Sequence, residues 1–119
     1  MSDEAAAEQL AQDVREVLIE LIGDRPDVTE RRTFGMPAFY CASNGKMFAG
    51  ATKRGLVLKL PAATVRELKT RPDAHDFGPG GRVMKEWVEL RRDDAAGFAD
   101  EFALILAAKD FVEQGSSPE

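Results

Sequence analysis

One cysteine, Cys41, and one histidine, His75, are the residues of this sequence best suited to nucleophilic and acid–base chemistry. A thiol activated by a nearby imidazole is one such arrangement, so a Cys41–His75 pair is an alternative to consider. Apolar neighbours of Cys41 are typical of a buried, unreactive thiol, whereas the acidic residues beside His75 favour a solvated side chain. A single histidine excludes a metal site built from several histidines. We therefore expect no enzymatic activity, no metal and no cofactor.

A glycine-rich segment, residues 78–81, precedes Arg82 and suggests a phosphate-binding loop. It lacks the Gly-Lys-Ser/Thr ending of a P-loop, and no helix is predicted to begin directly after it. A connection with special backbone geometry is the simpler interpretation. The alternative is an anion site formed with Lys46, Lys59 and Lys85.

The charges are divided unevenly along the chain, whose formal net charge is −5. Residues 31–92 carry 13 basic and five acidic side chains, a net charge of +8, and the two flanking segments carry the remaining −13. One interpretation is a pair of solvated acidic helices beside a sheet with lysines and arginines on its open face and edges. The other is a basic surface that binds anions or nucleic acid. Its candidate contacts are Arg31, Arg32, Lys53, Arg54 and Arg82.

The spacing of apolar residues predicts the elements that must position these side chains. Apolar residues recur every four positions from Leu10 to Ile22, which predicts an amphipathic helix that ends near Gly23. Asn44-Gly45 is a strong signal for a hairpin turn. We expect an antiparallel meander of three strands, at residues 36–41, 46–51 and 56–60.

Further along, Pro61 is suited to the start of a short helix that ends near Lys69, and residues 84–90 are typical of a strand. Asp93 or Asp94 is expected to cap a last helix. The predicted order of elements is α-βββ-α-ββ-α, although the sequence does not assign residues to one strand of the later pair. This order predicts a two-layer α+β sandwich. In this single domain, residues 1–119, the N- and C-terminal helices pack on one face of an antiparallel sheet.

Alternation along the strands predicts which side chains lie on the face away from the helices. Leu56, Leu58 and Leu60 are expected in the core, so Val57 and Lys59 point the other way. On the neighbouring strand, either Lys46 with Phe48 or Met47 with Ala49 shares that side. The candidate interaction face comprises Lys46, Phe48, Val57, Lys59, Lys85 and Trp87.

Trp87 is the most informative residue of this predicted face. As the only tryptophan of the chain, it is either a core or edge-packing aromatic or an exposed anchor for a partner. Tryptophan is enriched in binding hot spots, and large exposed apolar residues on a sheet face usually mark an interface.

Length and composition limit the class of protein. The 119 residues are enough for one hydrophobic core, and one cysteine cannot form an intrachain disulfide, which fits a reducing cytoplasm. No apolar run approaches the roughly 20 residues of a membrane span, and the acidic N-terminus is unlike a signal peptide.

Four blocks in this order resemble the TfoX N-terminal domain family and, more distantly, MmcQ/YjbR-like proteins. They are Thr-Phe-Gly-Met-Pro-Ala-Phe-Tyr at 33–40, Asn-Gly-Lys-Met-Phe-Ala at 44–49, Leu-Val-Leu-Lys-Leu-Pro at 56–61 and Phe-Gly-Pro-Gly-Gly-Arg-Val-Met-Lys-Glu-Trp at 77–87. The resemblance covers about residues 8–112 and is strongest to stand-alone relatives. It implies an α+β fold, no catalytic residues and a link to the regulation of transcription or competence in bacteria, with DNA binding proposed for YjbR-like proteins.

From these observations we expect a small cytoplasmic, non-enzymatic regulatory module. Its partner would be another protein or a second copy, bound through the open sheet face. The alternatives are direct binding of nucleic acid and binding of a small anionic ligand. No membrane association is expected.

Overall fold

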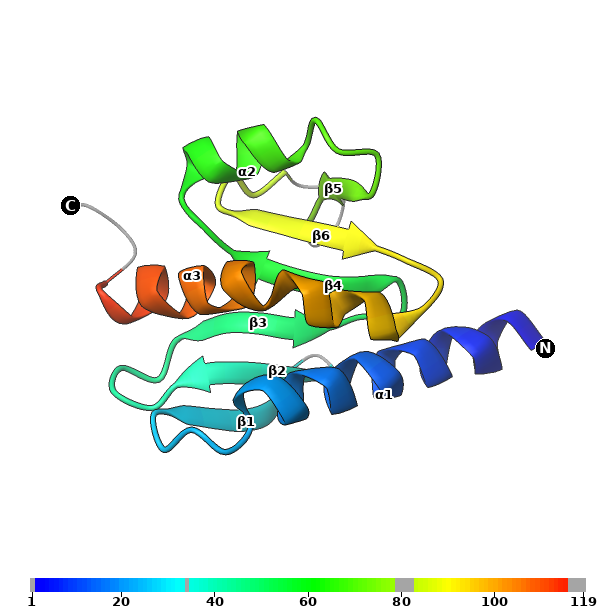
Figure 1. Cartoon of the computed structure of the whole chain (residues 1–119), viewed down its shortest axis with the longest axis horizontal. Coiled ribbons are helices and arrows are strands. Elements are labelled where there is room, and N and C mark those ends of the chain that lie inside the picture. The colour runs from blue at the N-terminus through cyan, green and yellow to red at the C-terminus, as the bar shows by residue number, and fades with distance from the viewer. Residues whose placement is uncertain (1, 34, 79–82, 116–119) are drawn as a thin grey trace.

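Six antiparallel strands form one sheet in the order β1-β2-β3-β4-β6-β5, and two long helices cover one of its faces (Figure 1). The computed structural model describes residues 2–33, 35–78 and 83–115, and side chains from residue 5 onward. The elements are α1 (Ser2–Ile22), β1 (Val28–Thr33), β2 (Met36–Cys41), β3 (Met47–Ala51), β4 (Gly55–Lys59), α2 (Ala62–Leu68), β5 (Ala74–Asp76), β6 (Trp87–Arg91), the 3₁₀ helix η2 (Ala95–Glu101) and α3 (Phe102–Glu113). The predicted two-layer α+β class is confirmed.

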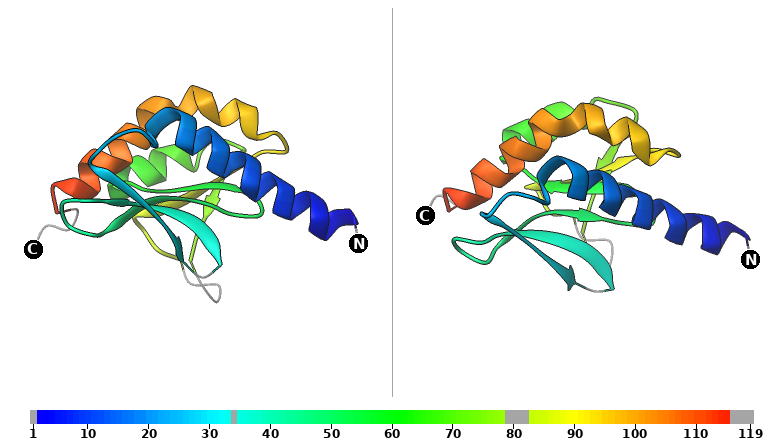
Figure 2. Two further views of the ribbon diagram at one scale, coloured as in Figure 1. Left: turned by 90° about the horizontal axis from the view of Figure 1, so that it is seen from below. Right: turned by 60° about the horizontal axis from the view of Figure 1, so that its bottom comes forward.

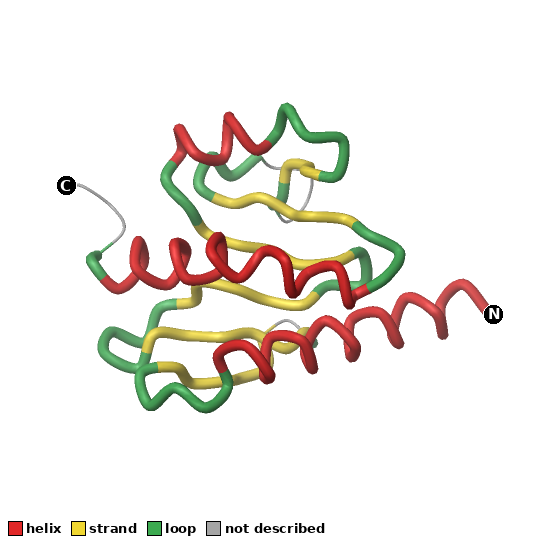
Figure 3. The backbone as a smooth tube through the Cα atoms, viewed as in Figure 1, coloured by secondary structure: helices red, strands yellow, loops and turns green. Residues whose placement is uncertain are grey.

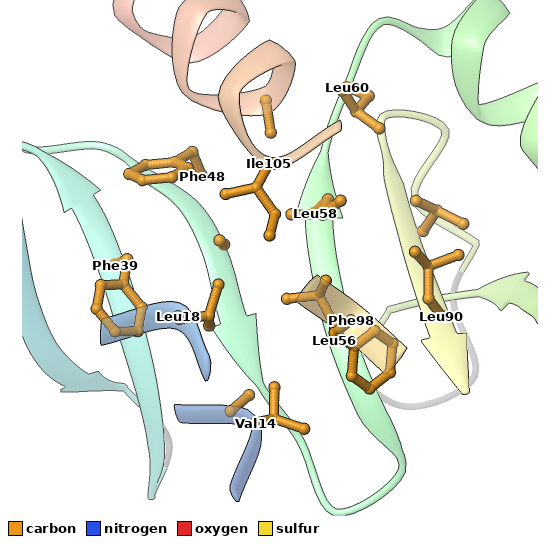
Figure 4. Close-up of a cluster of buried hydrophobic side chains, with 14 of the residues drawn as sticks. Val14, Leu18, Phe39, Phe48, Leu56, Leu58, Leu60, Leu90, Phe98 and Ile105 are labelled. Atoms are coloured by element: carbon orange, nitrogen blue, oxygen red, sulfur yellow. The ribbon is translucent and has the colours of Figure 1, made fainter. Parts of the chain in front are cut away.

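The core lies between the sheet and the layer formed by α1 and α3. These helices run beside each other across the same face of the sheet (Figures 2 and 3). Leu56 and Leu58 of β4 lie in this core with Val14 and Leu18 of α1, and Ile105 of α3 packs in the same cluster (Figure 4). The apolar spacing along the first helix therefore identified the side that it buries.

The last helix begins as predicted and differs in its first turns. The carboxylate of Asp94 accepts a hydrogen bond from the backbone N–H of Ala96 at 3.0 Å, which caps the start of η2. The chain then runs through seven residues of 3₁₀ helix before α3. Phe98 in this segment is buried against the sheet.

Two edge strands complete the sheet beyond the predicted ones. β1 was not predicted, because most of its side chains are exposed and show no apolar alternation. At the other edge, β5 contains only three residues and includes His75, which we had expected in a loop. Charged side chains on β1 and the shortness of β5 are common ways to protect a sheet edge from pairing with other chains.

Four charged side chains join the β5 edge to the helical layer; we call them the charge cluster: Arg71, Asp73, Arg92 and Glu101. Arg71 donates to both carboxylate oxygens of Asp73 at 3.1 and 3.0 Å and to Glu101 at 2.9 Å. Arg92 also donates to both carboxylates. Burial alone would raise the pKa of Asp73 and Glu101, but the hydrogen bonds from the two arginines outweigh it, so both pKa values lie below the usual range.

A second buried contact holds the C-terminal half of α3. Lys109 is 4% exposed, and its ammonium lies 2.6 Å from Asp27 and 3.0 Å from Glu113. Burial would lower the pKa of Lys109, but the hydrogen bonds that its ammonium donates to these carboxylates raise it above its usual value. The lysine is therefore a structural cation that ties α3 to the start of β1.

Candidate interaction site

The face of the sheet away from α1 and α3 carries an apolar hollow of about 350 Å³. We call it the methionine–tryptophan hollow; it is lined by Thr33, Met36, Met47, Phe77, Gly78, Met84 and Trp87. The lining brings Phe77 and Gly78, from the segment that follows β5, together with residues of β1, β2 and β3. The backbone N–H of Met84 donates to the carbonyl of Phe77 at 3.3 Å and holds the two described ends of the segment together.

Trp87 forms one wall of the hollow. Its ring lies 5.9 Å from that of Phe77, at an interplanar angle of 49°, which is a favourable tilted arrangement of aromatic rings. The side chain is half-buried. Trp87 therefore packs against Phe77 and also lines the hollow, and its role as an anchor for a partner stays a prediction.

The floor of the hollow depends on Gly50, a glycine in the middle of β3. A Cβ atom at this position would lie 2.8 Å from the terminal methyl of Met47 and 3.3 Å from Val57. The Met47 side chain therefore extends along its own strand into the space that the glycine leaves. An unbranched thioether adapts to such irregular space and contacts aromatic rings favourably.

The rim of the hollow carries hydroxyl groups and a cation from β1 and β2. The hydroxyls of Thr33 and Tyr40 are hydrogen-bonded to each other across the two strands. The guanidinium of Arg31 lies 4.4 Å from the centre of the Tyr40 ring, a cation–π contact that fixes the orientation of this exposed arginine.

One residue of the predicted interaction face lies elsewhere. Phe48 is fully buried in the core, pointing toward α3 with Ile105 (Figure 4). The pairing of β2 with β3 shifts register between Phe39 and Tyr40, so strict alternation fails at this point and Met47 lies opposite Tyr40. Neither predicted pair, Lys46 with Phe48 or Met47 with Ala49, shares the open face.

Val57 does point away from the helices, in register with Gly50 and Glu89, yet its side chain is fully buried. The prediction of an accessible Val57 is therefore wrong. The face is not open at its centre, because Met47 lies against Gly50 and because Phe77 and Gly78 lie beside Met36 and Met47 on this face.

The lysines of the predicted face surround the hollow instead of forming a continuous surface. Lys59 lies opposite Trp87 in the β4–β6 pairing, and its ammonium is 4.0 Å from Glu86. Lys46 and Lys85 are exposed residues of the turns that precede β3 and β6.

A larger hollow of about 650 Å³ adjoins the first and shares Met36 and Phe77 with it. It lies where the turns after β1 and β3 approach α1, and we call it the cationic hollow because Arg32, Lys53 and Arg54 line it. These three were predicted anion contacts, and the structure brings them together. Arg31 lies on the other side of the sheet edge, and Arg82 is outside the described residues.

Sequence reasoning missed the apolar lining of the first hollow. Met36, Met47, Phe77 and Met84 come from four separate segments, and none belongs to a motif with a known chemical role. The available signal was their place in the four blocks quoted above, which contain all four residues. In the structure, Met84 and its neighbour Val83 are the two large apolar side chains described as exposed, at 37% and 58%.

Pairing within the molecule neutralises much of the positive charge of residues 31–92. Among the residues that the structure describes, six basic side chains of this stretch lie within 4.0 Å of a carboxylate. They are Lys53, Lys59, Lys69, Arg71, Arg91 and Arg92. The basic stretch of the sequence is therefore not a continuous basic surface of the fold.

The geometry does not support a nucleophilic pair of Cys41 and His75. Four strand spacings separate β2 from β5, about 19 Å at the usual 4.8 Å per strand. Cys41 faces the core, where its thiol donates to the Lys109 carbonyl at 3.6 Å, and burial raises its pKa. Within the described part of the chain, no group of His, Cys, Asp and Glu side chains could hold a metal ion.

No protein-family profile, curated protein or solved structure matches this chain. Over residues 2–33, 35–78 and 83–115, none of the helices combines the length and apolar character needed to cross a lipid bilayer.

Proposed function

We propose that this chain is a small cytoplasmic, non-enzymatic regulatory module that binds a protein partner through the face opposite α1 and α3. The observation that carries this proposal is the methionine–tryptophan hollow, bordered by the exposed Val83 and Met84. A patch with a central aromatic residue, adaptable methionines and a polar rim has the usual composition of a protein interface.

The resemblance to the TfoX N-terminal domain family supports the regulatory part of the proposal. By analogy with that family, we propose that the chain acts on transcription or competence through a bound protein. The blocks that carry the resemblance include Met36, Met47, Phe77, Met84 and Trp87, and all five line the hollow.

The charge distribution favours a protein partner over nucleic acid. A nucleic-acid interface needs several cations that can neutralise neighbouring phosphates, and strong salt dependence follows from them. Here Lys59, Arg91 and Arg92 are already paired with carboxylates of the same fold. We therefore take the apolar hollow, and not the remaining cations, as the main contact surface for a partner.

The experiment is photo-crosslinking in cells with a crosslinker at Val83, followed by binding of the purified partner. Met84→Asp places a charge in the hollow at a partly exposed site, so the fold should persist. Ala103→Asp adds the same charge to an exposed position of α3 and serves as the control. We expect a partner that binds the wild type and Ala103→Asp but binds Met84→Asp at least tenfold more weakly. Equal binding to both variants would contradict the proposal.

A further inference from the structure

We propose that the two joined hollows bind a small organic anion, with a compact apolar or aromatic body against the methionines and Trp87 and its anionic group at Arg32 and Arg54. This inference goes beyond the proposed protein partner and does not depend on it. It would make the same face responsive to a metabolite-sized ligand.

The size and lining of the methionine–tryptophan hollow suit the apolar body. Small-molecule sites usually have volumes of about 300–1,000 Å³ and mainly apolar walls. The hollow has about 350 Å³, and its lining is apolar apart from Thr33. Trp87 and Phe77 offer aromatic surface, while the thioethers of Met36 and Met47 adapt to different shapes.

The cationic hollow, which adjoins the first, provides the half of the site for the anionic group. Met36 and Phe77 line both hollows, so the two adjoin at these side chains, and a ligand seated on Trp87 would have to reach past them to the cationic hollow. Arg32 and Arg54 lie there. A guanidinium has the planar donor geometry that suits a carboxylate or a phosphate.

Arg54 is the cation most available to a ligand. It is exposed, and among the described residues its guanidinium has no hydrogen bond or ion pair. Arg32 donates one hydrogen bond, to the Gly35 carbonyl at 2.8 Å, which uses one of its five N–H groups and holds the guanidinium in place.

Two carboxylates also line the cationic hollow, and both are engaged by the protein. Glu89 is 5% exposed, and its two oxygens accept from Thr52 and Arg91, each at 2.8 Å. Glu8 lies 3.9 Å from the ammonium of Lys53. Repulsion of an anion at Arg54 is therefore reduced by the cations that these carboxylates already hold.

The test is titration of the purified chain with three probes that share a phenylalkyl body: 4-phenylbutyrate, 3-phenylpropyl phosphate and the uncharged 4-phenylbutyramide. Trp87 is the only tryptophan, so its fluorescence reports on the hollow directly. Three of the four methionines line the hollow, so methyl-labelled methionine gives an independent NMR signal from the site. We expect at least one anionic probe to saturate with a Kd below about 1 mM and to shift those three methyl resonances.

The variants separate the two halves of the proposed site. Arg54→Gln should raise the Kd of the anionic probes about three- to tenfold and leave that of the amide unchanged. Arg66→Gln, an exposed arginine of α2 outside both hollows, is the matched control and should change neither.

Three results would overturn the inference: no saturable signal with either anion, an amide that binds as tightly as the anions, or equal weakening by Arg54→Gln and Arg66→Gln. None of these results contradicts the proposed protein partner, because that proposal is tested by crosslinking and not with these probes. Conversely, a loss of partner binding in Met84→Asp would not account for weaker binding of the anionic probes to Arg54→Gln. The two proposals can therefore fail separately.

Discussion

At the scale of single residues, Glu101 shows how burial and pairing compete. Its carboxylate lies at the end of η2, where burial disfavours the ionised form. Hydrogen bonds from Arg71 and Arg92 stabilise that ionised form. Because its folded pKa lies below the ordinary glutamate value of about 4.3, ionised Glu101 stabilises the fold above that value. This stabilisation is lost as the pH falls through the folded pKa.

Replacing the carboxylate tests this account. Glu101→Gln leaves Arg71 and Arg92 with a neutral partner, so we expect the free energy of unfolding at pH 7 to fall by about 2–3 kcal/mol. Urea unfolding between pH 7 and pH 3 should also show a shallower loss of stability in the variant, because one of the coupled carboxylates is gone.

Glu67→Gln provides the comparison, since Glu67 is exposed on α2. It should follow the wild-type pH profile within about 0.5 kcal/mol. If Glu101→Gln lost stability on acidification as steeply as the wild type, the charge cluster would not be the source of the effect.

At the scale of elements, the turn between β3 and β4 is held by one side chain. The Thr52 hydroxyl accepts from the backbone N–H groups of Arg54 and Gly55 at 3.1 and 3.0 Å, and it donates to Glu89 at 2.8 Å. The turn is therefore bonded to β6, and it positions Arg54 at the cationic hollow.

Thr52→Val keeps the shape of the side chain and removes these three hydrogen bonds, together with a longer one of 3.3 Å from the hydroxyl to the Gly55 carbonyl. We expect a loss of about 1–3 kcal/mol in the free energy of unfolding, because the buried Glu89 oxygen loses its partner. Thr52→Ser keeps the hydroxyl and should retain most of the stability. Denaturant unfolding of the two variants measures the difference, and equal losses would show that packing of the methyl group matters more than the hydroxyl.

The elements also differ in how well their own sequence predicts them. α1 follows from apolar spacing, because it buries one side along its own length. The strands β2 to β4 follow from short apolar runs separated by turn signals, and they are buried on both faces along most of their length. β1 has no such pattern, since it pairs at an edge and exposes most of its side chains. Phe48 was misplaced because a register shift in the pairing of β2 and β3 interrupts the alternation.

At the scale of the whole molecule, one core joins both layers. α1 comes from the start of the chain and α3 from its end, and Val14 and Ile105 belong to the same buried cluster around β4. Neither helix can therefore keep its buried side covered without the sheet. Trp87 lies on the opposite face and reports on the sheet independently of the helices.

We therefore expect a single cooperative unfolding transition. Helix content followed by far-UV circular dichroism and Trp87 fluorescence should give the same urea midpoint. Midpoints separated by more than about 0.3 M would exceed the usual agreement of two-state probes and would show that the sheet or a helix unfolds separately.

The sequence by itself determined the α+β class, the two long helices and the central strands, because hydrophobic periodicity depends only on neighbouring residues. It also located the cations at Arg32, Lys53 and Arg54 without showing that they share a hollow. Only the tertiary structure decided that Lys59, Lys69, Arg71, Arg91 and Arg92 pair internally. It also decided that Phe77 and Met84 reach the face bordered by β1 and β2. Most of those features arise from contacts between segments far apart in the chain, which local spacing cannot specify.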